Sequence, residues 1–327
     1  MRMLTKRRGL LVAATLMTTA LLAPAGAFAQ SDKPLRVIVG FPAGVSIDVV
    51  SRIVADKLKD ELKRPVIIDN RAGAGGRLAA DLLKSAAPDG NTVMVTPVVV
   101  PVLAPMVFSK LGYNPETDFS PVVRLCDFSF ALAVGLDTPA KTLKEYVAWI
   151  KANPQKANFG SPAAGSLPHF FGEMIGNTLG INMVHVPFNG GAALQSAVLG
   201  GHVPAGIDVV MEWQQNSKAG KVNILATSGP SRSKVMPDVP TFKELGYPDI
   251  VGQGWFAMYA PAKMPAEQIE VLNRAVNKVL AMPDVRDRFA ALGLDPGDGT
   301  AADLQRTMHD DTRRWAPIVK KSGFRAN

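Results

Sequence analysis

Two short turns hold the residues whose types and spacing fit binding chemistry. The stretches "FPAGVSID" (41–48) and "GSPAAGS" (160–166) each follow a strand-like run and precede a helix-like run. A helix that begins there leaves the N–H groups of its first turn without intrahelical acceptors, and its dipole adds positive potential. Such a place holds a carboxylate. Two helix starts that face one cleft could therefore grip a single carboxylate through backbone N–H groups.

The first turn supplies six candidate ligand-binding residues, which are Phe41, Pro42, Ala43, Gly44, Ser46 and Asp48. Gly44 permits a positive φ or a close approach of the ligand, and Pro42 stiffens the turn. Ser46 offers a hydroxyl group. The sequence leaves two interpretations of Asp48 open: it contacts the ligand, or it caps the helix and braces the turn.

The second turn supplies five candidates, which are Ser161, Ala163, Ala164, Gly165 and Ser166. His169 follows them and is expected to cap or pack. Ala74 is a further candidate, although its glycine-rich stretch "NRAGAGG" (70–76) fits a tight packing turn equally well and lacks the Gly-Lys-Ser/Thr of a phosphate loop. Thr96 is the main hydroxyl after the third strand. Asp208 ends an apolar strand, where it could accept hydrogen bonds from the ligand or cap the next helix.

Catalytic and metal chemistry have little support. Ser166 and His169 could be a nucleophile and its base, but the G-x-S-x-G elbow is missing and residues three apart on a helix rarely adopt that geometry. His185, His202 and His309 complete the four histidines, and no pair of these has the spacing of a zinc site. We expect no enzymatic activity, no metal and no cofactor.

Strand-like and helix-like runs alternate along the chain, which is typical of parallel βαβ units. The first set has predicted strands at 35–41, 65–69 and 91–97, and helical segments near 48–62, 76–86 and 101–110. The second set has predicted strands at 156–161, 181–188 and 222–229, and helices near 167–179 and 190–200. The sequence predicts two α/β halves, with ligand contacts beyond the carboxyl ends of their strands.

Two β-rich stretches without helical partners, 118–136 and 252–262, are predicted to cross between the halves and to form a hinge beside a cleft. Trp255, in the second crossing, either lines the pocket or packs the hinge. Thr142 and Glu145 form a capping box before a helix over 142–152. Helices near 265–281, 284–292 and 301–321 follow the second crossing.

The first 29 residues predict export. A basic start, an apolar run and small residues before Ala29 are typical of a secretory signal peptide cleaved after Ala29. The apolar run is too short for a membrane span. Arg7-Arg8 also fits a twin-arginine signal, so the Sec and twin-arginine routes both stay open. Cys126 is the only cysteine, which excludes an intrachain disulfide.

The net charge and its distribution argue against a nucleic-acid partner. The formal net charge is +8, but residues 1–30 carry four basic residues and no acid, which leaves +4 for the rest. No run of five Lys/Arg remains and the aromatic residues are scattered, so we expect no nucleic-acid partner. A mild positive charge favours anionic small molecules.

After residue 29 the whole chain resembles the Bug periplasmic receptors, the solute-binding components of tripartite tricarboxylate transporters. The motifs that carry the resemblance include "PLRVIVGFPAG", "PVIIDNRAGAGG", "AAPDG", "YNPETDFSPV", "NFGSPAAGS", "VHVPFNGG", "PDVPTFKELGYP" and "WFAMYAPAKMP". The resemblance implies a two-lobed type II periplasmic-binding-protein fold with a Venus-flytrap cleft. Lobe I would comprise 30–130 and 255–327, and lobe II 131–254.

The same resemblance implies the function. The 41–48 and 161–166 loops would hold the carboxylate of a small organic acid through backbone amides and bridging water. The lobes would close about the crossings near 128–132 and 252–257. The receptor would work in the periplasm as a monomer and deliver its ligand to a membrane permease.

Two departures from the family pattern concern the ligand. Val45 replaces the usual second glycine after "FPAG", and "TPVVVPVLAP" (96–105) is more apolar than the family norm. We therefore expect a carboxylate with an apolar or aromatic body in place of a citrate-like acid. Asp208 occupies a position from which some relatives contact the far end of the ligand.

Three rival functions remain. The same fold could sense a ligand for a signalling partner, and a neighbouring gene for a sensor kinase or a permease would separate the two roles. An exported hydrolase would turn over esters or amides through Ser166 and His169. An adhesion or scaffold module would not need the two turns.

Overall fold

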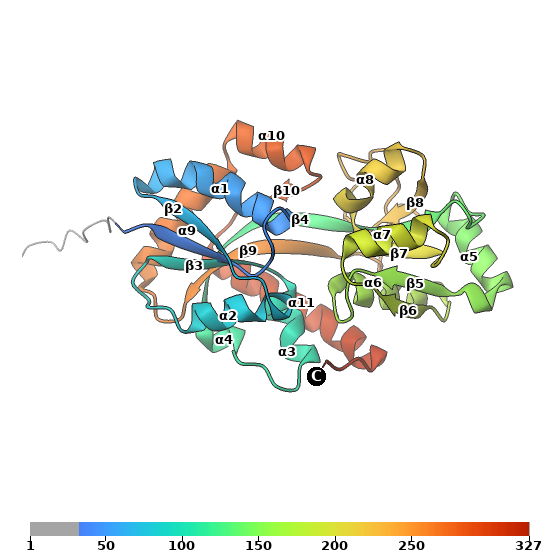
Figure 1. Ribbon diagram of the computed structural model, residues 1–327, viewed down its shortest axis with the longest axis horizontal. Coiled ribbons are helices and arrows are strands. Elements are labelled where there is room, and N and C mark those ends of the chain that lie inside the picture. Colours follow the sequence, from blue (N-terminus) through green and yellow to red (C-terminus); the bar gives the residue numbers. More distant parts are fainter. Residues whose placement is uncertain (1–32, 327) are drawn as a thin grey trace, which may run out of the picture. The chain divides into compact units, whose positions relative to one another are not determined.

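The computed structural model describes residues 33–326, and the predicted signal peptide (1–29) lies outside them. The strands of the described residues are β1 (Leu35–Val39), β2 (Val66–Asn70), β3 (Thr92–Pro97), β4 (Phe119–Gly135), β5 (Asn158–Ser161), β6 (Val184–Pro187), β7 (Ala205–Val209), β8 (Val222–Thr227), β9 (Gln253–Pro261) and β10 (Asp295–Pro296). They form one sheet in the order β2-β1-β3-β9-β4-β7-β5-β6, and β8 and β10 pair with β4 (Figure 1).

The helices of the described residues are α1 (Ser46–Leu62), α2 (Arg77–Lys84), α3 (Ala104–Val107), α4 (Pro115–Asp118), α5 (Leu143–Ala152), α6 (Leu167–Leu179), α7 (Gly191–Leu199), α8 (Val210–Lys218), α9 (Ala266–Leu280), α10 (Pro283–Ala291) and α11 (Ala301–Ser322). Short turns of other helix types are η1 (Ala74–Gly76), η2 (Val99–Leu103) and η3 (Pro154–Lys156). The segment expected near 101–110 is thus the π-helical turn η2 followed by α3.

The first half of the sheet is parallel. β1 lies between β2 and β3, with Val37 opposite Ile68 and Val93. The near-continuous apolar run of β1 fits a strand that is covered on both faces. The 41–48 turn leaves the carboxyl end of β1, and the turn with Ala74 follows β2. Both turns therefore emerge at the same edge of the sheet, as predicted.

In the second half β5, β6 and β7 repeat this arrangement, whereas β8, predicted at 222–229 as part of a parallel unit, pairs antiparallel with β4. β5 pairs in parallel with β6 and with β7. The 161–166 turn follows the end of β5, and Asp208 is the penultimate residue of β7. The carboxyl ends of these strands therefore bring Ser161 and Asp208 to one edge.

β4 joins the two halves. Its residues Phe119–Ser129 pair with β9, and its residues Phe130–Gly135 pair with β7 and β8. β9 pairs with β3 and β4, and its first residue, Gln253, lies opposite Ser129. Figure 1 shows β4 and β9 side by side between the two sets of strands, and both predicted crossing strands are confirmed.

The helices pack apolar faces against this sheet. The predicted capping box of Thr142 and Glu145 is present at the start of α5. α9 packs on α1 and β4, whereas α11 contacts β4, η2 and α6. Cys126 in β4 is a free, buried thiol. Among residues 33–326, none of the helices has the length and apolar character that crossing a membrane requires.

Candidate functional site

The two predicted ligand turns share one geometry. Gly44 and Gly165 both have a positive φ, +88° and +73°, and each lies just before the N-cap residue of a helix, α1 or α6. In each turn the glycine N–H donates to a side chain four residues later. Gly44 donates to Asp48 Oδ2 at 2.8 Å, and Gly165 donates to His169 Nδ1 at 3.1 Å. These side chains fix the turn, so the glycine N–H groups are already satisfied.

Asp48 braces the first turn. Its side chain is 2% exposed, and it also accepts hydrogen bonds from Arg52 Nε at 2.9 Å and from Asn70 Nδ2 at 2.8 Å. Burial alone would raise the pKa of Asp48, but the hydrogen bonds from Arg52, Gly44 and Asn70 outweigh it and lower the pKa. The structure places this carboxylate in contact with its own turn, which fits the bracing interpretation.

The start of α1 keeps free donors. Its N-cap residue is Val45, which makes no side-chain cap hydrogen bond. The N–H groups of Ser46, Ile47 and Asp48 precede the first intrahelical bond, from Val49 N–H to Val45 O. An anion beside this turn would meet several N–H donors and the positive end of a 17-residue helix.

The start of α6 offers fewer donors. Ser166 is the N-cap and accepts a hydrogen bond of 3.4 Å from His169 N–H, while its hydroxyl donates to Ala163 O at 2.7 Å. Pro168 lacks an N–H group, so Leu167 carries the remaining donor in the first two helical positions. Ala163 and Ala164 are exposed.

Two stacked histidines support the 161–166 turn. The sequence did not reveal that they form a pair. The rings of His169 and His185 lie 3.8 Å apart at 17°. His185 Nε2 lies 2.7 Å from the hydroxyl of Ser161, which also donates to Ala163 O at 3.0 Å. Burial lowers the pKa of both rings to about 4, and the neighbouring His169 contributes to the shift of His185. His169 and His185 are 16 positions apart, so no local motif reveals the pair.

Ser166 and His169 do not form a nucleophile and base. Their hydrogen bond uses the backbone N–H of His169, while the ring accepts from Gly165. The Ser161 hydroxyl beside His185 is completely buried. Among residues 33–326, no three His, Cys, Asp or Glu side chains gather as metal ligands would.

Glu212 brings a carboxyl group to the 41–48 turn, and Asp208 lies near Glu212. Asp208 is 4% exposed, and its Oδ1 accepts a hydrogen bond of 2.8 Å from Val209 N–H. Burial raises the pKa of Asp208 to about 7, the Val209 N–H opposes the shift, and the nearby Glu212 adds to it. Glu212 Oε1 accepts a hydrogen bond of 3.2 Å from the Ser46 hydroxyl. No local motif in the sequence points to Glu212.

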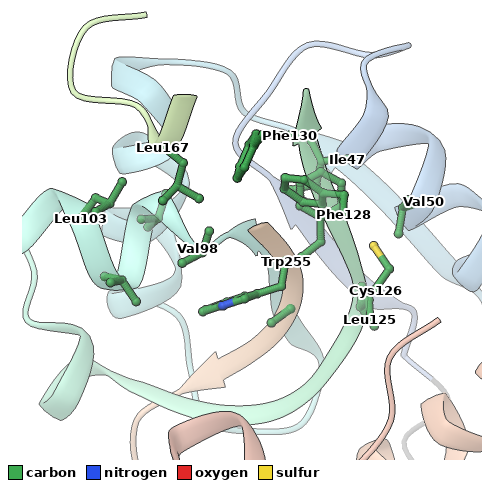
Figure 2. Packing of buried hydrophobic residues seen from close by; sticks show 14 of the residues in the cluster. Ile47, Val50, Val98, Leu103, Leu125, Cys126, Phe128, Phe130, Leu167 and Trp255 are labelled. Carbon is green, nitrogen blue, oxygen red and sulfur yellow. The ribbon is translucent and has the colours of Figure 1, made fainter. Parts of the chain in front are cut away.

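Apolar side chains adjoin both helix starts. Ile47 and Leu167, from the first turns of α1 and α6, belong to one buried cluster with residues of η2 and β4 (Figure 2). The other members shown there include Val98, Leu103, Phe128 and Phe130. The apolar stretch after β3 is therefore buried in the same cluster as side chains from the two helix starts.

The other candidates take different positions. Phe41 is half-buried, and its ring would lie 3.1 Å from a Cβ at Gly76. Pro42 and Ala43 are exposed, as is Ala74, which has a φ of +49°. Thr96 is buried in β3.

Trp255 packs at the hinge. It is 2% exposed, and its indole N–H donates to Asp311 Oδ2 in α11 at 2.7 Å. This contact fits the packing interpretation of Trp255.

Comparisons with known proteins agree on the family. The model of the tripartite tricarboxylate transporter family receptor, TctC, matches residues 50–324. Protein BugT of Bordetella pertussis is 32% identical over 307 residues, which cover 94% of each chain.

Solved structures share the architecture. R. palustris Rpa4515 with adipate superposes with a TM-score of 0.81 at 26% identity, covering 89% of this chain and 97% of that one. MatC of Rhodopseudomonas palustris with bound malate gives a TM-score of 0.76 at 29% identity, covering 88% and 99%. The two-lobed fold predicted from the sequence is confirmed.

Proposed function

Because the chain belongs to the tripartite tricarboxylate transporter receptor family, we propose that the starts of α1 and α6 hold the carboxylate of its ligand. The protein is a periplasmic carboxylate-binding receptor of a tripartite tricarboxylate transporter. The observation that carries the assignment of the site is the shared geometry of the two turns. In each, a positive-φ glycine is tied to a side chain in the first turn of the helix, which fixes the orientation of that helix start.

Fixed N–H donors suit reversible capture. A charge-assisted hydrogen bond contributes about 1.5–3 kcal/mol, and donors that are already oriented lose little entropy on binding. The uncapped α1 start would provide most of the donors, and Leu167 N–H of α6 would add one from the other lobe. The remaining predicted residues of the turns, from Phe41 to Gly44 and from Ser161 to Ser166, would shape the backbone around the anion.

The ligand body is proposed to be apolar or aromatic. Two similar receptors were solved with adipate and with malate, so the carboxylate group is the common feature. In this chain Ile47 and Leu167 lie in the first turns of α1 and α6, and both belong with Leu103 to one buried apolar cluster. A citrate-like acid would place several charged oxygens against this hydrocarbon without partners, which is costly.

Closure would couple binding to transport. We propose that lobe I (30–130 and 255–327) and lobe II (131–254) close about the strands near 128–132 and 252–257, because the ligand contacts both lobes only in the closed state. The closed monomer would then dock on the membrane permease. No bond is made or broken in this cycle. Export would follow cleavage after Ala29, by the Sec or the twin-arginine route.

Asp208 is proposed to face the far end of the ligand, together with Thr96. Asp208→Ala should then weaken binding by more than about threefold for the best ligand found. An affinity within threefold of wild type for every ligand would remove Asp208 from the site.

Calorimetric titration tests the ligand class. The mature protein should bind hexanoate or benzoate and respond weakly to citrate. Tight citrate binding with no response to aliphatic or aromatic acids would contradict the proposal. A thermal-shift screen of carboxylates extends the test, because a ligand that binds only the folded state raises the melting temperature.

A further inference from the structure

Glu212, in the first turn of α8, reaches the helix start where we place the ligand's carboxylate. Its Oε1 accepts a hydrogen bond from the hydroxyl of Ser46, the first residue of α1, at 3.2 Å. The two residues are 166 positions apart in sequence and belong to different predicted lobes. Glu212 therefore brings one of the protein's own carboxylates to the start of α1.

The second oxygen of Glu212 faces another helix start. A Cβ placed on Gly191, the first residue of α7, would lie 4.0 Å from Glu212 Oε2 and 2.9 Å from Asp208 Oδ2. The N-cap of α7 is Gly190, which has no side chain to cap the helix. The Glu212 carboxylate thus lies near the positive ends of two helices, α1 and α7.

No basic side chain of the described residues forms an ion pair with this carboxylate. Of the ion pairs formed within residues 33–326, none includes Glu212 or Asp208. Within residues 33–326, the Glu212 carboxylate accepts one side-chain hydrogen bond, and the Ser46 hydroxyl donates it. Glu212 therefore accepts from a hydroxyl group and lies near two helix starts, which are the surroundings that would also hold a ligand's carboxylate.

We propose that Glu212 is an intramolecular competitor of the ligand, a carboxylate that occupies Ser46 and the α1 start in the ligand-free chain and that the ligand's carboxylate displaces. The inference rests on the proposed function, because it assumes that the ligand binds at the α1 start. It adds a residue that sets the affinity of the site. Binding becomes an exchange of one carboxylate for another, so the ligand gains only the difference between the two sets of interactions.

Titration of three chains with hexanoate tests the exchange. Glu212→Gln removes the charge, and Glu212→Asp keeps the charge but shortens the reach to Ser46. We expect the Gln variant to bind hexanoate about tenfold more tightly than wild type and the Asp variant about threefold more tightly, since each weakens the internal competitor. Asp60→Asn is the matched control, because it removes an exposed carboxylate from α1 far from its start. It should leave the affinity unchanged.

The outcomes separate the alternatives. Weaker binding by the Gln variant would overturn the proposal, because Glu212 would then assist the ligand. A gain in the Gln variant with none in the Asp variant would also overturn it, since charge alone would explain the gain.

A ligand-free measurement tests the contact independently of the ligand class. A Ser46→Ala/Glu212→Ala double-mutant cycle on thermal unfolding should give a coupling clearly different from zero. A coupling of zero would overturn the competitor even if hexanoate binds. Absence of both hexanoate and benzoate binding in all chains would contradict the proposed function, and the inference with it.

Discussion

His169 and His185 stack ring on ring, with centroids 3.8 Å apart and planes at 17°. The pair holds both ends of the 161–166 turn, because His169 Nδ1 accepts from Gly165 N–H and His185 Nε2 contacts the Ser161 hydroxyl. A proton on His169 Nδ1 would turn this acceptor into a donor. The ionisation of the two rings is therefore linked to the shape of the 161–166 turn, where we propose that the ligand binds.

Acid should destabilise the protein through this pair. Burial lowers the pKa of each ring from 6.5 to about 4, so the folded state binds fewer protons than the unfolded state between these values. The stability that the neutral rings contribute is thus lost as the pH falls from about 6.5 to about 4. We expect the free energy of unfolding to fall by about 1–2 kcal/mol. This is less than the full pKa shifts would imply, because His185 is partly exposed. Urea denaturation at a series of pH values measures it.

His169→Asn is the informative variant for this prediction. Its amide oxygen can still accept from Gly165 N–H, but it cannot be protonated in this range. The variant should show a shallower loss of stability towards pH 4. Glu173, whose Oε1 lies 3.9 Å from His169 Nε2, and Lys321 near Glu173 are the other charged groups here. An identical pH profile for the variant would show that the pair does not titrate as described.

Removal of the Asp48 brace should cost both stability and affinity. Asp48→Ala leaves Gly44 N–H, Arg52 and Asn70 without their shared acceptor in a buried position. We expect the free energy of unfolding to fall by about 2–4 kcal/mol. Arg52→Ala is the control, because the Arg52 side chain is half exposed and its loss should cost about 1 kcal/mol or less. Equal effects of the two variants in urea denaturation would contradict the bracing role.

Asp208 should give the opposite pH dependence. Burial raises its pKa from 3.8 to about 7, so the folded state binds more protons than the unfolded state in this window. Stability is therefore lost as the pH rises from about 4 to about 7. The difference in the free energy of unfolding between Asp208→Asn and wild type should therefore change with pH. It should favour the variant by about 2–4 kcal/mol more at pH 8 than at pH 4. A difference that does not change with pH, measured by urea denaturation, would show that Asp208 is not buried as an acid.

The Trp255–Asp311 hydrogen bond should stabilise the hinge region. Trp255→Phe removes the donor and leaves the buried Asp311 carboxylate without it. We expect the free energy of unfolding to fall by about 1–3 kcal/mol. Trp149→Phe in α5 is the comparison for the loss of an indole elsewhere and should cost about 1 kcal/mol or less. Equal losses in both variants would assign the effect to ring size instead of the hydrogen bond.

Local patterns predicted most of the elements but not their partners. The helix over 167–179 matches α6, and the long strand over 118–136 matches β4 to within one residue at each end, because its apolar run has no helical period. The capping box of α5 follows from Thr142 and Glu145 alone. The helix α8 was predicted only as the helix that Asp208 could cap, without bounds, because its polar residues give no clear apolar stripe.

The candidate site shows the same limit. Gly44 and Gly165 could be identified from their turns, since a positive φ before a helix favours glycine. His185 and Glu212 could not, because each reaches its turn from a distant part of the sequence, 24 positions from Ser161 and 166 positions from Ser46. Such contacts depend on the order of the strands in the sheet, and no short sequence motif encodes that order.

A crystal structure of the mature protein with hexanoate tests the central claim most directly. The account predicts that the carboxylate lies about 2.7–3.2 Å from backbone nitrogens at the start of α1 and from Leu167 N, with its hydrocarbon chain against the apolar cluster and Glu212 turned away from Ser46. A carboxylate held by a lysine or arginine side chain, with both helix starts unoccupied by the ligand, would contradict it.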